Sequence, residues 1–164
     1  MKTATFLMLG LALTTTAAAG PADEVRCREI GFSKSVEAQD RELFPTFIDP
    51  DARFASNAVL RGDEAIADAW SSFFSEDSPR IKWRPQIVEV LEDGKLALSR
   101  GPFLVISKDD QDVESEHWGT FNSVWRLNDD GEWRVVFDAG SNEAESPTDE
   151  VKALLDQEDS CDEL

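Results

Sequence analysis

The residues of this sequence best suited to chemistry are one histidine, one arginine and one aspartate. His117 is the only histidine, and imidazole side chains exchange protons readily near neutral pH. Alternation along the strand predicted for residues 113–127 places His117 on the same side as Phe121 and Trp125. His117 is therefore a candidate proton shuttle facing an apolar interior. A position at the rim or edge of the sheet is the structural alternative.

Arg100 and Asp138 are the charged residues that could complete such a site. Arg100 shares its strand parity with apolar neighbours, although Gly101-Pro102 is a signal for a bulge that would shift the register. Asp138 ends the last predicted strand on the opposite parity from Trp133. Arg100 and Asp138 could form an ion pair that closes the sheet. Alternatively, Asp138 acts as an acid or base while Arg100 stabilises negative charge.

Aromatic residues form a second group with two interpretations, because they can fill a core or line a cavity for an apolar ligand. The candidates for pocket lining are Trp70, Phe74, Trp83, Phe121 and Trp125. One histidine with scattered carboxylates has no metal-ligand spacing, so no metal is expected. A glycine-rich phosphate loop between a strand and a helix is also missing from the sequence, and no cofactor is expected.

The elements that must position these residues follow from the hydrophobic periodicity. Helical patterns cover residues 24–39, a short segment through 43–48, and residues 63–74 after Gly62. Extended patterns separated by turn signals follow at 81–91, 95–107, 113–127 and 132–138, after short pieces at 52–56 and 59–61. Ser146-Pro147 predicts the start of a short terminal helix. Helices followed by a run of antiparallel strands predict an α+β fold with helices on one face of a curved sheet.

Charge and the two chain ends limit the function classes. The 164 residues carry a formal charge of −18, which disfavours binding to nucleic acid or to anionic lipid. Residues 1–19 have the pattern of a signal peptide, with an apolar run too short to span a bilayer. The mature chain is then expected to be exported to the periplasm or the extracellular space, without membrane insertion.

Export also affects how the two cysteines are interpreted. Cys27 lies near the start of the mature chain and Cys161 near its end. In an oxidising compartment this pair favours a disulfide, and two unrelated thiols are the alternative.

Three stretches of the chain resemble a known family. They are "FIDPDARFASNAVLRGDEAIADAWSSFF", "IKWRPQIVEVLEDGKLALSRGPF" and "GTFNSVWRLNDDGEWRVVFDAG". Their order and spacing resemble the SnoaL-like, nuclear-transport-factor-2-like (ketosteroid-isomerase-like) superfamily, here in an exported form. The matching residues are Arg61-Gly62, Gly119, Trp125, Gly131, Trp133 and Asp138.

This resemblance implies a cone-shaped, cystatin-like roll in residues 20–142, with an apolar pocket open at one end. Residues 143–164 would form an acidic C-terminal tail with a short helix. The fold alone does not select a chemistry. The sequence contains no tyrosine, and Ser56 aligns with the general base of ketosteroid isomerase, so steroid isomerisation is not expected.

Three functions remain open from the sequence. The first is an exported module that binds a small apolar or aromatic molecule. The second is a polyketide-cyclase or isomerase type of enzyme that uses His117 or Asp138 as acid-base. The third is a structural domain that forms a homodimer through its exposed sheet.

Overall fold

A computed structural model describes residues 20–75, 77–143, 146–158 and 161. The signal peptide predicted for residues 1–19 lies outside this range. The helical segments are α1 (Pro21–Glu37), η1 (Phe44–Phe47), α2 (Asp63–Trp70), η2 (Ser71–Phe73) and α3 (Asp149–Leu155). The strands are β1 (Ile48–Ala55), β2 (Val59–Arg61), β3 (Arg80–Trp83), β4 (Ile87–Val90), β5 (Leu96–Lys108), β6 (Glu114–Leu127) and β7 (Trp133–Asn142). The predicted α+β class is confirmed.

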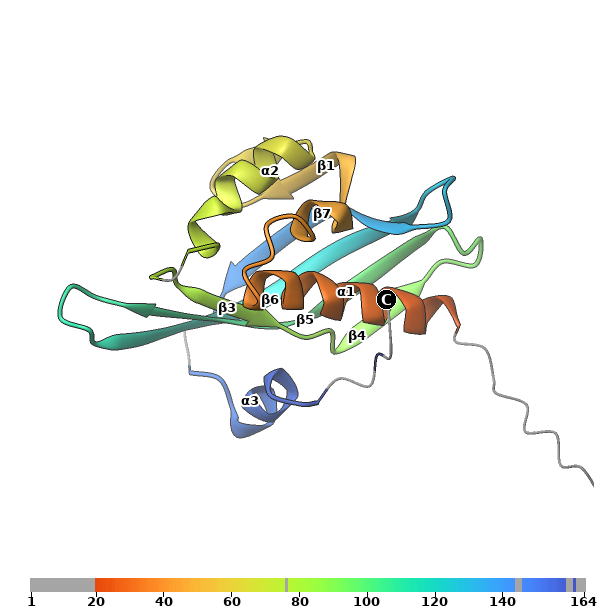
Figure 1. The fold of residues 1–164 in the computed structure, drawn as a ribbon. Helices are drawn as coiled ribbons and strands as arrows, with labels where there is room; N and C mark the ends of the chain where they lie inside the picture. The colour runs from red at the N-terminus through yellow and green to blue at the C-terminus, as the bar shows by residue number, and fades with distance from the viewer. Residues whose placement is uncertain (1–19, 76, 144–145, 159–160, 162–164) are drawn as a thin grey trace, which may run out of the picture.

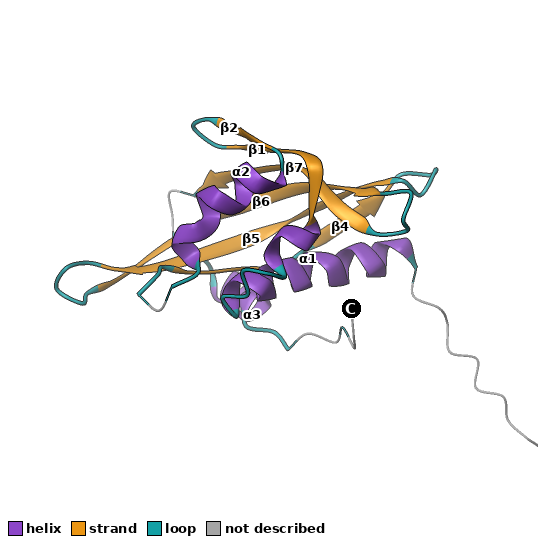
Figure 2. Ribbon diagram, turned by 45° about the horizontal axis from the view of Figure 1, so that its top comes forward, coloured by secondary structure: helices purple, strands orange, loops and turns teal. Residues whose placement is uncertain are grey.

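The strands form one mixed sheet in the order β2-β1-β7-β6-β5-β3, with β4 also paired to β5. The sequence predicted an antiparallel sheet, and this is correct except for one pair, because β1 and β7 run parallel. A parallel pair needs a long connection, and here most of the domain lies between these two strands. Figures 1 and 2 show α1 and α2 lying along the same twisted sheet, and we call the face that they cover the inner face.

Helix α1 packs on the sheet through one side. Val25, Glu29, Phe32 and Val36 recur at helical spacing and are all buried. The helix contacts β3, β4, β5 and β7, while α2 contacts β1 and β2. The core therefore lies between the inner face and these two helices.

Two irregularities change which side chains face inward. The strand predicted over residues 81–91 is divided into β3 and β4. A Cβ on Gly101 of β5 would collide with backbone atoms of Arg84 and Gln86 in the break, so Gly101 allows the close approach there. The pairing of β5 with β6 is continuous across Gly101-Pro102. The bulge expected at these two residues is therefore not present in the β5–β6 pair. Instead, β7 has an irregularity between its pairs with Val124 and Trp125.

Helix α3 lies on the side of the sheet opposite α1 and α2, which we call the outer face (Figure 1). Helix α3 begins at Asp149, and the Thr148 side chain caps it by accepting from the Val151 N–H at 3.3 Å, so the predicted start at Ser146-Pro147 is two residues early. The helix contacts β5, and Lys152 pairs with Glu116 of β6. Cys161 forms the predicted disulfide with Cys27 of α1, with 5.6 Å between their Cα atoms.

Candidate functional site

A cavity of about 510 Å³ lies against the inner face of the sheet. Its walls come from α1, β1, β2, α2 and β3 together with β5, β6 and β7. This volume is in the range of sites that bind small molecules. The lining residues are mainly apolar: Phe32, Phe54, Ala55, Ser56, Asn57, Leu60, Trp70, Ile81, Trp83, Phe103, Phe121, Asp138, Gly140 and Asn142.

Four of the lining rings contact one another in a closed circuit, which we call the aromatic quartet. It consists of Phe32, Phe54, Trp70 and Trp83. Their ring centroids are 5.2 to 6.4 Å apart and each contact is edge-to-face. Such contacts fix the rings against one another, so the quartet forms a preorganised aromatic wall.

Phe103 reaches the same cavity because Gly119 has no side chain. A Cβ placed on Gly119 would lie 2.6 Å from the ring of Phe103. The two residues face each other across the β5–β6 pair. The absence of a side chain at Gly119 therefore allows the ring to fold across the sheet.

Asp138 is the charged residue that lines the cavity. It pairs with Ser123 in the sheet, and the Ser123 hydroxyl donates to its Oδ2 at 2.7 Å. Val124 pairs with Phe137 and Trp125 with Val135, which leaves Val136 as an extra residue in β7. This bulge reverses the parity, so Phe137 is 57% exposed while Asp138 faces the cavity. Burial raises the pKa of Asp138 to about 6, opposed by the hydrogen bond from Ser123.

Glu29 is a second buried carboxylate, which the sequence analysis did not identify. It is fully buried and accepts from the indole Nε1 atoms of Trp83 at 2.6 Å and Trp125 at 2.7 Å. Burial raises its pKa to about 7, while the hydrogen bonds from Trp125 and Trp83 lower it and the charge of Asp138 raises it. Glu29 lies four residues after Val25 and three before Phe32. This spacing puts it on the apolar side of the predicted helix, and it could have been identified from the sequence on that basis.

The other two predicted catalytic residues do not face the cavity. His117 pairs with Val105 and is exposed in the part of the β5–β6 hairpin beyond α1 and α2, the helices of the inner face. Arg100 is exposed on the outer face, where it donates to Asn122 Oδ1 at 2.7 Å. The predicted parity of β5 is wrong, since Ala97, Ser99 and Gly101 are buried instead. His117, Arg100 and Asp138 therefore do not converge on one site, and no Arg100–Asp138 ion pair forms.

The predicted pocket residues divide into two groups. Trp70, Trp83 and Phe121 line the cavity. Phe74 packs on Phe44 instead, with ring centroids 5.3 Å apart. Trp125 lies deeper, fully buried with its indole on Glu29. Ser56, whose position aligned with a general base, lies in the cavity wall as an exposed side chain.

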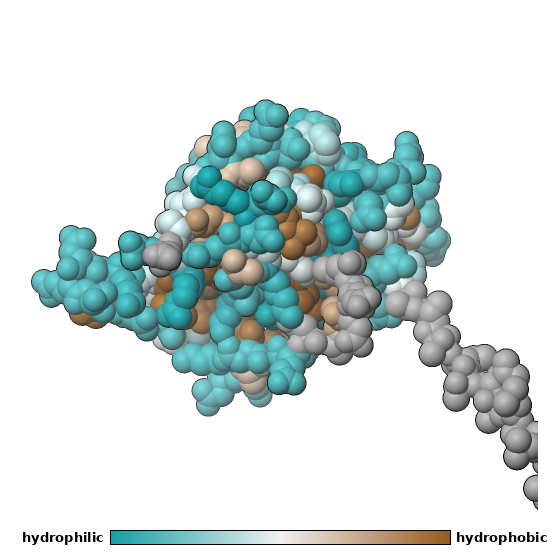
Figure 3. Space-filling model, viewed as in Figure 1, coloured by the Kyte–Doolittle hydropathy of each residue, from teal (hydrophilic) through white to brown (hydrophobic). Residues whose placement is uncertain are grey.

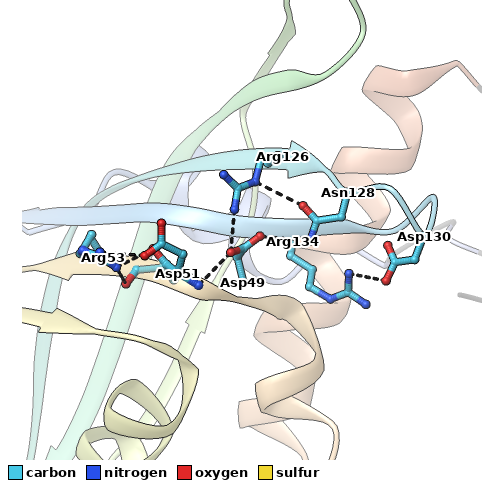
Figure 4. Close-up of polar contacts among 8 residues, drawn as sticks. Asp49, Asp51, Arg53, Arg126, Asn128, Asp130 and Arg134 are labelled. Carbon is cyan, nitrogen blue, oxygen red and sulfur yellow. Dashed lines mark hydrogen bonds and ion pairs between the residues drawn. The ribbon is translucent and has the colours of Figure 1, made fainter.

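A polar cluster surrounds a separate open hollow of about 520 Å³ at Asp49. Figure 4 shows Arg126 and Asn128 pointing toward Asp49, which they contact at 2.7 and 3.0 Å. Burial raises the pKa of Asp49, but hydrogen bonds from Arg126, the Asp51 N–H and Asn128 outweigh this and lower it. The hydrogen-bonding capacity of the Asp49 carboxylate is therefore used by its neighbours, and the cluster has a structural role in holding β1 to the end of β6.

Hydrophilic residues cover most of the surface in Figure 3, with hydrophobic residues showing in patches between them. Within the described ranges, no group of three or more histidine, cysteine, aspartate or glutamate side chains could hold a metal ion. None of the helices in the described part of the chain has the length and hydrophobicity that a bilayer crossing needs.

Comparison by sequence finds no matching family model and no matching curated protein. Solved structures do match. A ketosteroid isomerase-like protein from Erwinia carotovora atroseptica is 12% identical, with a TM-score of 0.65 over 76% of this chain and 97% of that one. An NTF2-like protein with a cystatin-like fold from Novosphingobium aromaticivorans is 17% identical, with a TM-score of 0.58 over 82% and 88%.

A third similar structure is described as a calcium/calmodulin dependent protein kinase II association domain from Xanthomonas campestris. It is 20% identical, with a TM-score of 0.63 over 85% of this chain and 100% of that one. Identities this low show the fold and not the activity. The resemblance found in the sequence motifs and the three-dimensional match agree, and the chain has the NTF2-like, cystatin-like fold.

Proposed function

We propose that this chain is an exported protein that binds a small apolar or aromatic molecule in the cavity at the inner face. The observation that carries the proposal is the preorganised aromatic wall around about 510 Å³ of space. The disulfide supports export, since such bonds persist in oxidising compartments. The intact mass of the exported protein tests this part, because a chain that starts near Gly20 is expected and a retained leader would contradict it.

Binding can be tested with a neutral hydrophobic dye such as Nile red. Leu60 lies on the cavity side of the short edge strand β2, opposite Phe54, whereas neighbouring Val59 is 44% exposed. The substitution Leu60→Trp should fill the cavity mouth and weaken dye binding about tenfold. Val59→Trp adds the same side chain beside the cavity and should leave the affinity unchanged. Equal affinities for both variants, measured by fluorescence titration, would place the dye elsewhere.

A homodimer through the outer face is a second candidate function, and one row of residues favours it. Strand pairing aligns Glu89, Leu98, Val124, Phe137 and Arg53 across β4, β5, β6, β7 and β1. Leu98 is 39% exposed and Phe137 57%, which is unusual for large apolar residues gathered in one row. A two-fold axis that passes through the centre of the row, perpendicular to it, would exchange the two ends of the row. Glu89 would then lie opposite Arg53 of the partner, as a self-complementary interface requires.

Sedimentation equilibrium of the wild type and of Phe137→Glu tests the dimer. We expect the wild type to dimerise and the variant to be monomeric, because a buried unpaired carboxylate is costly. Val113→Glu, at a similarly exposed position in the β5–β6 loop (58%), should remain dimeric. A monomeric wild type at about 100 μM would rule out a stable dimer of this kind.

A further inference from the structure

The ionisable side chain that lines the cavity is acidic. Of the described lining residues, only Asp138 carries an ionisable side chain, and the others with polar side chains are Ser56, Asn57, Trp70, Trp83 and Asn142. No lysine, arginine or histidine is included among the described lining residues. A carboxylate that accepts one hydrogen bond, from Ser123, retains capacity for a further donor.

The aromatic wall adds to the same preference. Aromatic ring faces attract cations, and tryptophan does so most strongly. Trp83 lines the cavity while its Nε1–H donates to Glu29. Its polar edge is therefore already satisfied, and hydrogen bonding to a carboxylate polarises the ring toward greater electron density.

Among the residues that the structure describes, no lysine, arginine or histidine acts on the pKa of Asp138. Glu29 on α1 is the nearby titratable group, and the charge of Asp138 raises its pKa. Its strand neighbours Phe54 on β1 and Ser123 on β6 are neutral. Arg53, one residue from Phe54, binds Asp51 at 2.8 Å. The formal charge of −18 also attracts cations over a longer range.

We propose that the cavity binds a small amine with an apolar or aromatic body, protonated at neutral pH, whose ammonium group pairs with Asp138 while its body packs on the aromatic quartet. This inference rests on the proposed function and specifies the ligand class of the same cavity. An anionic ligand would meet the Asp138 carboxylate without a counter-charge and is excluded by the same chemistry.

The test uses three probes with one aromatic body: 1-naphthylmethylamine, 1-naphthylmethanol and 1-naphthoate. Isothermal titration calorimetry at pH 7.5 should show the amine binding at least about tenfold more tightly than the alcohol, as a charge-assisted hydrogen bond provides. The carboxylate should bind most weakly. Asp138→Asn should remove the advantage of the amine and leave the alcohol nearly unaffected. Asp110→Asn, the same charge change at the exposed β5–β6 loop, should keep it.

The pH dependence gives a test without any substitution. The pKa values of Asp138, about 6, and of Glu29, about 7, mean that both become ionised between pH 5 and pH 8. The advantage of the amine over the alcohol should therefore grow with pH across this range.

The outcomes separate the two proposals. An alcohol that binds as tightly as the amine would overturn the amine inference and leave the proposed cavity function intact. Failure of all three probes to bind would overturn both. An amine advantage that survives Asp138→Asn would overturn the role of Asp138.

Discussion

Replacing Cys27 and Cys161 together with serine should lower the free energy of unfolding by about 4 kcal/mol. The disulfide closes a loop between residues that are 134 positions apart. The stabilisation assigned to such closure grows with loop length. Urea unfolding of the double variant and of the oxidised wild type measures the difference, since the midpoint reports stability when the slope is unchanged.

The same substitution should release α3 before the rest of the domain unfolds. Helix α3 has seven residues, and Leu155 is its one buried residue. Its ion pairs, Lys152–Glu116 and Lys82–Asp156, involve partly exposed side chains and contribute little. Limited proteolysis should therefore cut the double variant first in the tail, and a tail as protected as in the wild type would contradict this. Dithiothreitol applied to the wild type provides a control without mutation.

Folding stability should decrease by about 4 kcal/mol between pH 5 and pH 8 because of the buried carboxylates. The pKa of Glu29 rises on folding from 4.5 to about 7, and that of Asp138 from 3.8 to about 6. A raised folded-state pKa stabilises the protein below the unfolded value, and this stabilisation is lost as the pH rises through the folded value. Asp49 has a lowered pKa, so its contribution changes only below this window.

Thermal unfolding of the wild type, Glu29→Gln and Glu92→Gln at pH 5 and pH 8 measures this effect. The melting temperature of the wild type should be higher at pH 5. Glu29→Gln should reduce the difference by more than half, whereas Glu92→Gln, an exposed residue in the turn after β4, should not. A wild type that is more stable at pH 8 would contradict the assignment of Glu29 and Asp138 as desolvated carboxylates.

The sequence patterns predicted the order of helices and strands because hydrophobic periodicity is a local property. Helix α1, predicted over 24–39, spans Pro21–Glu37, and the last strand continues to Asn142 rather than ending at Asp138. The parallel β1–β7 pair was missed, because it depends on contacts between distant parts of the chain.

The direction of the site residues depended on features that alternation does not encode. Asp138 faces inward because of the bulge at Val136, which is fixed by the pairing of β6 with β7. His117 has the inward parity but is exposed, because it lies beyond α1 and α2 on the inner face. Arg100 was placed on the wrong face because the apolar residues Leu96 and Leu98 are partly exposed on the outer side.

Binding inside the cavity is tested most directly by the indole Nε1–H signals of the five tryptophans in ¹H–¹⁵N spectra during titration with 1-naphthylmethylamine. Trp70 and Trp83 line the cavity, and their signals should shift with probe concentration. Trp118 pairs with Leu104 on the outer side, and Trp133 donates to Glu24 at 3.2 Å, so these two signals should stay in place. Shifts confined to Trp118 or Trp133, or none at saturating probe, would contradict binding in the cavity.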